Sequence, residues 1–305
     1  MARKQARAST RRVVPKTPWW RTRGATIGGI VGLGVLALIG FVVLSGGGNQ
    51  TVVGAIVWAT LGTRDVHSLA FDPSDAQHLY FGHHNGLLES RDGGRTWQPT
   101  GLSGADAMNV RTGGGSALQI AGHNVYMETA DGGRTWTDVP NDLPGLDLHA
   151  FVVDPGDPTH AWAWAVGFGL FESTNRGQHW QPRQLGDWPV LAVIKSAAST
   201  TLVGVSAAGL EASSDGGRSW QPLVAPGGQI ASLAAATDGS VLLAGTTQGL
   251  YRSVDGGKSW QPTGFTGLAI TVAIAPNDAR VIAVVDDKTR FFRSDDGGMT
   301  WPGPR

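Results

Sequence analysis

Short apolar runs alternate along this chain with turns rich in glycine and polar residues, and the pattern predicts β-strands rather than helices. In the first complete unit, polar and apolar side chains alternate up to Asp72-Pro73, where a turn is expected. A second turn at 82–86 and a tight hairpin at 91–94 divide the rest of the unit. The strands of this unit are expected at residues 67–71, 79–81, 87–90 and 96–98. One unit therefore contains four strands.

The same unit recurs six times, and the copies carry the eight-residue motif Ser/Thr-x-Asp-x-Gly-x-Thr/Ser-Trp, from which only the third copy, residues 173–180, departs. The tryptophans of successive copies are separated by 39, 44, 40, 40 and 41 residues, a period that is typical of β-propeller blades. The aspartate position is held by Asp92, Asp131, Asn175, Asp215, Asp255 and Asp296, and the tryptophan position by Trp97, Trp136, Trp180, Trp220, Trp260 and Trp301. We interpret these residues as structural, because a carboxylate at a hairpin can accept bonds from amides one to two residues on, while tryptophan fills space between layers. Asn175 can make the same side-chain turn.

The chain is therefore expected to be all-β, a six-bladed β-propeller of four-stranded blades over residues 52–305. The 45 glycines fit a fold with many tight turns. After the last motif the chain is too short and too rich in proline for an outer strand. The apolar run 52–58 is expected to supply that strand and close the ring, which removes two exposed sheet edges.

The N-terminal part differs in composition from the propeller. Residues 1–24 hold eight basic residues and no acid and are interpreted as a cytoplasmic tail. The uncharged stretch 25–44 is long enough for one transmembrane helix, and residues 45–51 read as a flexible Gly-rich linker. The basic tail predicts a single-pass cell-membrane protein with a cytoplasmic N-terminus and an extracytoplasmic propeller. A cleaved signal peptide is the alternative, and residues 10–16 also resemble a twin-arginine signal, so export is expected either way.

Charge and cysteine content narrow the function classes. The formal net charge is zero, but the chain after residue 24 carries a formal charge of −8, which argues against a nucleic-acid partner. The absence of cysteine excludes disulfides, thiolate metal sites and cysteine nucleophiles.

The repeated motif resembles the Asp-box (BNR) repeats of sialidases, of the sortilin ten-bladed domain, of xyloglucan-degrading hydrolases and of the photosystem II assembly and stability factor. The resemblance covers residues 52–305 and implies the propeller fold. Its relatives include enzymes, receptors and assembly chaperones, so it leaves the function open.

Sialidase chemistry, as this resemblance implies it, requires a tyrosine nucleophile partnered by a glutamate. Tyr80, Tyr126 and Tyr251 occupy strand positions typical of the core, and every glutamate lies on a third strand next to the motif. A typical sialidase is therefore not expected. A glycoside hydrolase of another kind would draw its carboxylate pair from Asp65, Asp106, Asp147, Asp187, Asp286 and Asp287.

A candidate site is expected at the end of the blades opposite the motif, where five histidines accumulate. Asp65-Val-His67 and Asp147-Leu-His149 occupy the same repeat position in the first and third units, and alternate residues of a strand point the same way. The candidate ligand residues are Asp65, His67, His83, His84, Asp106, His123, Asp147 and His149. Imidazole with carboxylate suits a divalent metal such as zinc, or a general acid and base. The alternative is that these are solvated loop histidines, two of which were copied by duplication.

Taken together, the sequence favours a membrane-anchored binding or scaffold module. Its partner, a protein or a glycan, would meet the face opposite the motifs, and help in assembling an envelope protein complex is one concrete version. The glycoside hydrolase is the first alternative, and a propeller that binds a divalent metal is the second; no other cofactor is expected.

Overall fold

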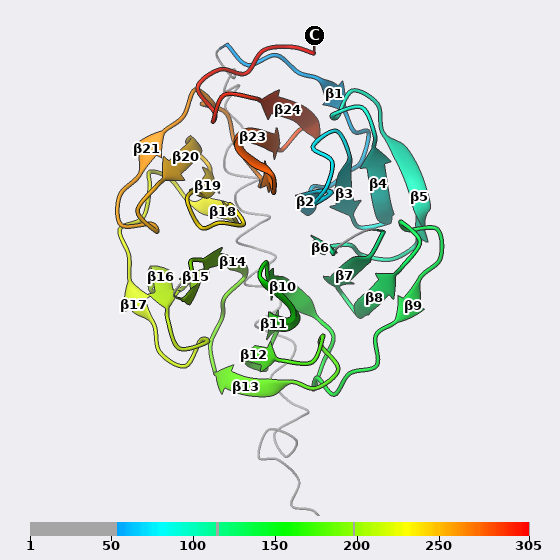
Figure 1. The fold of residues 1–305 in the computed structure, drawn as a ribbon, viewed down its shortest axis with the longest axis vertical. Coiled ribbons are helices and arrows are strands. Elements are labelled where there is room, and N and C mark those ends of the chain that lie inside the picture. The colour runs from blue at the N-terminus through cyan, green and yellow to red at the C-terminus, as the bar shows by residue number, and fades with distance from the viewer. Residues whose placement is uncertain (1–53, 114–115, 198, 305) are drawn as a thin grey trace, which may run out of the picture.

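The computed structural model describes residues 54–113, 116–197 and 199–304. In these ranges the chain forms six four-stranded antiparallel sheets, which stand as blades around a ring (Figure 1). Within each of the first five blades, strands that follow one another in the sequence pair with one another, and the first of them lies innermost. The prediction of an all-β, six-bladed propeller with four-stranded blades is confirmed.

The strands follow the repeat closely. Blades 1 to 3 contain β2 (Ser68–Phe71), β3 (Leu79–His83), β4 (Gly86–Ser90) and β5 (Gln98–Ser103); β6 (Asn109–Thr112), β7 (Leu118–Gly122), β8 (Val125–Thr129) and β9 (Thr137–Asp138); and β10 (Leu148–Asp154), β11 (Asp157–Ala165), β12 (Gly169–Ser173) and β13 (Gln181–Gln184). Blades 4 to 6 contain β14 (Val190–Lys195), β15 (Thr200–Ser206), β16 (Gly209–Ser213) and β17 (Gln221–Pro222); β18 (Ile230–Ala235), β19 (Leu242–Thr246), β20 (Gly249–Ser253) and β21 (Gln261–Pro262); and β22 (Thr271–Ala275), β23 (Asp278–Val285), β24 (Arg290–Ser294) and β1 (Ala59–Thr60).

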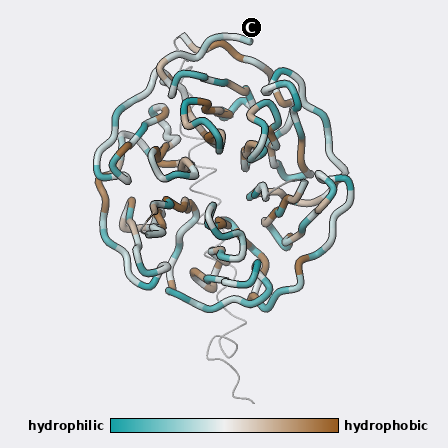
Figure 2. Tube along the Cα trace, viewed as in Figure 1, coloured by the Kyte–Doolittle hydropathy of each residue, from teal (hydrophilic) through white to brown (hydrophobic). Residues whose placement is uncertain are grey.

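The hydrophobic core lies between neighbouring blades rather than in one central mass. Tyr80 of blade 1 packs in one cluster with Val110 and Ile120 of blade 2, and Phe71 packs with Phe291 of blade 6. Because a blade is covered on both faces, strands such as β3 and β10 are apolar almost without interruption and are buried almost throughout. Figure 2 shows hydrophobic segments within the blades and a rim that is mostly hydrophilic or intermediate in hydropathy.

Each repeated motif folds into a hairpin that its own side chains hold together. In the first copy the Ser90 hydroxyl accepts a 2.9 Å bond from the Gly94 amide and donates to Asp92. The Asp92 carboxylate accepts bonds from the amides of Arg95 and Thr96 at 3.0 and 2.9 Å. The amides lie three and four residues beyond the aspartate, so the expectation of one to two residues was wrong. The Asp92 carboxylate therefore binds residues on both sides of this longer turn, Ser90 before it and Arg95 and Thr96 after it.

The third copy keeps this shape although its sequence departs from the motif. Asn175 accepts from the Ser173 hydroxyl and from the His179 amide, both at 2.9 Å. Arg176 has φ 62°, in the position where the first copy has Gly93 with φ 77°. The side-chain turn of Asn175 is therefore sufficient to hold a non-glycine residue in the left-handed region.

The motif tryptophans pack between layers and mostly tie the hairpin to itself. The indole nitrogen donates to the carbonyl of the glycine three residues earlier in Trp97, Trp136, Trp180 and Trp301. Trp260 donates instead to Val224, and Trp220 stacks on Trp188 with 5.2 Å between ring centroids.

The N-terminal segment closes the ring. Strand β1 pairs with β24 through Ala59 and Phe291, so the fourth strand of the last blade comes from the opposite end of the chain. The amide of Ile56 also donates to Trp301, which extends this contact toward the N-terminus. The predicted closure is confirmed, but the strand itself is Ala59–Thr60 rather than 52–58, of which residues 52–53 lie outside the described ranges.

The predicted basic tail 1–24, transmembrane helix 25–44 and linker 45–51 also lie outside the described residues. Among the residues that are described, no helix has the length and apolar character needed to cross a membrane.

Candidate functional site

The clustered histidines and the repeated motif lie at opposite ends of the blades. In blade 1, His84 lies in the turn between β3 and β4, whereas the motif forms the next turn, between β4 and β5. Successive turns of antiparallel strands alternate between the two ends of a sheet. His67 directly precedes β2 and contacts His84, so it lies at the same end. We call this end, which carries His67, His84, His123 and His149, the histidine face, and the other end the motif face.

The segment that leads into β6 places Asp106 between the hairpins of two blades. The Ala107 amide donates a 3.2 Å bond to the carbonyl of His83. A Cβ on Gly82 would lie 2.2 Å from the Ala107 oxygen, and one on Gly122 would lie 2.0 Å from the Asp106 oxygen. Glycine at both positions therefore lets this segment pass between strands β3 and β7, and the Asp106 side chain reaches both hairpins.

The first half of the site joins residues of blades 1 and 2. His67 Nε2 lies 3.2 Å from Asp65 Oδ2 and 3.2 Å from Asp106 Oδ1. His84 Nδ1 contacts both His67 Nε2 and Asp65 Oδ2, and the His84 amide donates a 2.9 Å bond to the same Asp65 oxygen. His67 is thus enclosed by two carboxylates, whereas the His84 side chain is 56% exposed.

The second half joins blades 2 and 3. His123 Nδ1 contacts Asp106 Oδ2, and its Nε2 lies 3.0 Å from His149 Nε2. Asp147 Oδ1 lies 3.0 Å from His149 Nε2 and 3.4 Å from His123 Nε2. The His149 ring is buried and packs edge-on against Trp164, with 5.6 Å between ring centroids. Asp106 therefore connects the two halves into one continuous cluster.

The first half has strongly shifted pKa values. Burial by itself would lower the pKa of His67, but hydrogen bonds and charge from Asp106 and Asp65 outweigh it and raise that pKa to about 9. Burial would raise the pKa of Asp65, yet bonds from the His67 side chain and the His84 amide lower it to about 2. His67 is therefore an imidazolium ion at neutral pH, held between two carboxylates.

The pKa values of the other two carboxyl groups are lowered as well. At both Asp106 and Asp147, burial by itself would raise the pKa. Contacts with His67 and His123 lower the pKa of Asp106, and contacts with His149 lower that of Asp147. Within the described residues, neither these carboxylates nor Asp65 pairs with lysine or arginine. The buried His149 Nδ1 makes no hydrogen bond there, and the buried oxygens Asp106 Oδ1 and Asp147 Oδ1 face histidine ring nitrogens. Such a set of groups suits a bound cation or proton exchange.

Of the eight candidate ligand residues, the structure brings seven together and leaves His83 apart. The His83 ring stacks on Phe81, its Nδ1 accepts a 3.3 Å bond from the Asn85 amide, and burial lowers its pKa. Three groups of potential ligand atoms overlap along the cluster: Asp65 with His67 and His84; His84 with Asp106 and His123; and His123 with Asp147 and His149.

Sequence reasoning missed the glycines that allow the cluster to form. His84-Asn85 and His123-Asn124 occupy the same repeat position, because Leu79 pairs with Ser90 as Leu118 pairs with Thr129, whereas Gly82 and Gly122 lie one position apart. Asn124 has φ 56°, as a tight hairpin requires. This shared His-Asn pair was the available signal that the two hairpins present His84 and His123 in the same way.

The carboxylates considered for glycoside hydrolysis have varied surroundings. Asp286 is buried and accepts a 2.6 Å bond from Arg290 Nε, which marks a structural ion pair. Asp187 and Asp287 are exposed, and the remaining three contact the histidines of the cluster.

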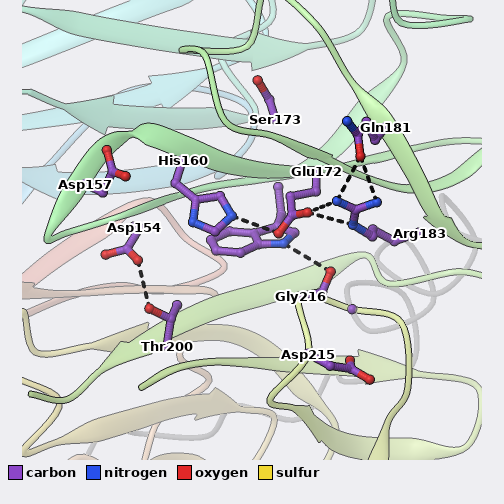
Figure 3. Close-up of polar contacts among 12 residues, drawn as sticks. Asp154, Asp157, His160, Glu172, Ser173, Gln181, Arg183, Thr200, Asp215 and Gly216 are labelled. Carbon is purple, nitrogen blue, oxygen red and sulfur yellow. Dashed lines mark hydrogen bonds and ion pairs between the residues drawn. The ribbon is translucent and has the colours of Figure 1, made fainter. Parts of the chain in front are cut away.

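The two histidines of the motif face, His78 and His160, each contact a glutamate instead of projecting freely into solvent. His78 is only 8% exposed and lies 3.1 Å from Glu89, and His160 lies 2.8 Å from Glu172. Figure 3 shows that Glu172 also meets Arg183, whose Nε donates a 2.7 Å bond. Because these histidines, glutamates and Arg183 pair with one another, we infer that they have a structural role.

The fold and its repeats define the class of the protein, a six-bladed β-propeller of BNR-type repeats. A comparison with protein families matches residues 57–209 to the family described as Photosynthesis system II assembly factor YCF48. The match spans half of the chain, and the chain belongs to this family. A comparison with curated proteins found no match.

Solved structures share the fold at low identity. YCF48 from Cyanidioschyzon merolae is 19% identical, with 81% of this chain and 88% of that chain covered and a TM-score of 0.50. The GH74 xyloglucanase from Xanthomonas campestris is 19% identical, with 77% and 45% covered and a TM-score of 0.51, so this chain spans less than half of that enzyme. A structure of YCF48 bound to D1 peptide is 20% identical, with 82% of each chain covered and a TM-score of 0.47.

Proposed function

We propose that this chain is a binding and scaffold module that assists the assembly of an envelope protein complex, and that its partner meets the histidine face. One observation carries the proposal: all seven clustered residues lie within residues 57–209, the part that matches a family described as an assembly factor. A rigid ring that presents polar loops from several blades is suited to holding a protein partner.

The proposal includes the location of the propeller. The basic tail 1–24 and the apolar stretch 25–44 support a single-pass anchor with a cytoplasmic N-terminus, which places the propeller outside the cytoplasm. In cells that produce the full chain, alkaline carbonate should leave it in the membrane fraction. Protease added to spheroplasts should digest the propeller and spare the basic tail.

A glycoside hydrolase has less support. The GH74 likeness lies below 20% identity and shows the fold alone. Asp65, Asp106 and Asp147 each contact histidines rather than facing one another across an open groove. An assay of the full chain on a panel of glycans tests it, and hydrolysis that is lost in Asp65→Asn would replace the scaffold proposal.

Site-specific photo-crosslinking in the native host tests the scaffold proposal. A benzoylphenylalanine at exposed Asn85, on the histidine face, should form an adduct with one defined protein. The same probe at exposed Arg134, on the motif face, is the matched control and should not form it. Deletion of the chain should then lower the amount of the complex that contains the cross-linked protein.

Two results would contradict the proposal. Equal adducts from both faces would mean that the histidine face does not select the partner. An unchanged amount of the assembled complex after deletion would mean that the adduct reflects proximity without assistance in assembly.

A further inference from the structure

We propose that His123, Asp147 and His149 form the binding site of a zinc-like divalent transition-metal ion, which Asp106 supports from behind. The proposal concerns the chemistry of the histidine face and does not depend on the identity of any protein partner. It rests on the spacing of three ligand atoms, on the orientation of their rings and on the charge of the surrounding groups.

The three ligand atoms have the spacing of one face of a tetrahedral metal site. His123 Nε2, His149 Nε2 and Asp147 Oδ1 are separated by 3.0, 3.0 and 3.4 Å. Zinc is bound by nitrogen and oxygen at about 2.0–2.2 Å, so its ligand atoms in a tetrahedral site lie roughly 3.3 Å apart. A single ion can therefore contact all three atoms at its usual bond lengths with only small shifts.

The partners of the two rings direct the correct nitrogen atoms to this point. His123 Nδ1 contacts the carboxylate of Asp106, whose side chain is only 9% exposed, and this leaves Nε2 directed at the proposed ion. A carboxylate behind a ligating histidine fixes the tautomer and the ring orientation in known zinc sites. His149 Nδ1 makes no hydrogen bond, so all the polar contacts of that buried ring are made by Nε2.

The charges around the triad favour a cation. Asp147 Oδ1 is a buried oxygen that faces the Nε2 atoms of His149 and His123, although the rest of its side chain reaches solvent. Among the described residues no lysine or arginine pairs with Asp106 or Asp147. A metal ion placed between this carboxylate oxygen and the two imidazole nitrogens would coordinate all three atoms at once.

The neighbouring group of Asp65, His67 and His84 is a weaker candidate for the same ion. His67 already lies between the carboxylates of Asp65 and Asp106, each 3.2 Å away, and forms an internal ion pair with them. A metal there would first have to displace that interaction. The proposed ion therefore belongs to the blade 2 and blade 3 half of the cluster.

The donor atoms also restrict the metal. Two imidazoles and one carboxylate suit zinc, cobalt or nickel, whereas calcium and magnesium prefer oxygen ligands alone. Three protein ligands leave a fourth position for water or for a group from a bound molecule. The site is therefore of the open kind, at the face where we place the partner.

Calorimetric titration with zinc chloride and metal analysis test the proposal on the purified full chain, first stripped with chelator. We expect zinc to bind this site with at least micromolar affinity, and magnesium not to compete. Cobalt added in place of zinc should give the intense visible bands of a four-coordinate site. His149→Ala and His123→Ala should weaken binding at this site by more than about 100-fold, and Asp106→Asn by about 10- to 100-fold.

Matched variants separate loss of the site from loss of the fold. His160→Ala removes a partly buried histidine that lies in the same blade as His149 but on the motif face. This variant should bind zinc like the original chain. His67→Ala should weaken binding less than His149→Ala does. A thermal unfolding transition, measured in the presence of chelator, should show that each variant used in the comparison is folded.

Two outcomes would overturn the proposal. The first is a folded chain that binds no zinc, or one whose zinc affinity is lowered as much by His160→Ala as by His149→Ala. The second is zinc binding that is abolished in the His67→Ala variant but persists in the His149→Ala variant, which would place the ion in the other half of the cluster.

Discussion

The indole nitrogen of Trp58 donates a 2.7 Å hydrogen bond to the carbonyl oxygen of Pro302, across 244 residues of sequence. Trp58 also packs edge-on against Phe291 of β24, and its ring lies under the guanidinium groups of Arg95 and Arg293. The contact joins the two ends of the propeller, where the last blade is completed by the start of the chain. Ring closure therefore depends on a few side chains as well as on the two residue pairs of β1 and β24.

Trp58→Ala should weaken this closure. Loss of a partly buried aromatic ring and of its hydrogen bond is expected to lower the free energy of unfolding by about 2–4 kcal/mol. Trp58→Phe keeps the contact with Phe291 and should lower it by about 1 kcal/mol, the value of one hydrogen bond. Urea unfolding of the full chain measures both. Equal stability of the two variants would show that Trp58 does not close the ring.

Ser253→Ala should destabilise the fifth motif hairpin. The buried Ser253 hydroxyl accepts a 2.8 Å bond from the Gly257 amide and donates to Asp255 at 2.7 Å. Without it the buried amide has no partner, which is expected to cost about 1–3 kcal/mol of unfolding free energy. Ser253→Thr is the control, because Thr129 makes the same bonds in the second copy. Urea unfolding measures the free energy of unfolding of both variants. An alanine variant as stable as the threonine variant would contradict the prediction.

The motif carboxylates should make stability fall in acid. Bonds from the Ser259 hydroxyl and amide lower the pKa of Asp255 from 3.8 to about 2, and the pKa values of its counterparts Asp92, Asp131, Asp215 and Asp296 are also lowered. A carboxyl with a lower pKa in the folded state stabilises the fold fully above its unfolded pKa and loses this effect as pH falls through the folded value. The melting temperature should therefore drop between about pH 4 and pH 2.

Asp255→Asn provides the control for this acid effect. Its amide cannot titrate, and Asn175 shows that asparagine maintains the hairpin. The variant should lose less melting temperature over the same pH range than the original chain does. Identical acid profiles would mean that the motif carboxylates are not responsible.

Arg183→Met should be strongly destabilising, because it leaves the buried Glu172 carboxylate without its principal partner. Arg183 and Glu172 side chains are 10% and 8% exposed, and Figure 3 shows Glu172 between Arg183 and His160. Breaking a buried ion pair from one side costs about 3–5 kcal/mol. The double variant Glu172→Gln with Arg183→Met should recover part of this loss, since the buried charge is gone. Thermal and urea unfolding measure both, and a double variant less stable than the single one would contradict the expectation.

The blades could be predicted from the sequence because their determinants are local. Each motif hairpin is closed by bonds that span four residues or fewer, as at Ser90 and Asp92, so the motif specifies its own geometry wherever it occurs. Ring closure was also foreseeable, because the last copy lacks an outer strand. The bounds of β1 were not, since a strand that pairs across the whole chain takes its register from its partner.

The candidate residues of the histidine face could be named from their repeat positions, but their contacts could not. His83 and His84 are adjacent in the sequence, and the turn between β3 and β4 decides that only His84 reaches Asp65. In the same way, His78 meets Glu89 because β3 and β4 pair in a register that places Tyr80 opposite Glu89.

The amino-acid sequence by itself determined the number of blades, the hairpin at each motif and the separation of the two faces, because strand periodicity and turn chemistry act over a few residues. Only the tertiary structure decided that Asp106 lies between His67 and His123, and that His123 meets His149 of the next blade. Those contacts depend on the close passage of the chain past Gly82 and Gly122 and on the packing of neighbouring blades, which no local pattern encodes.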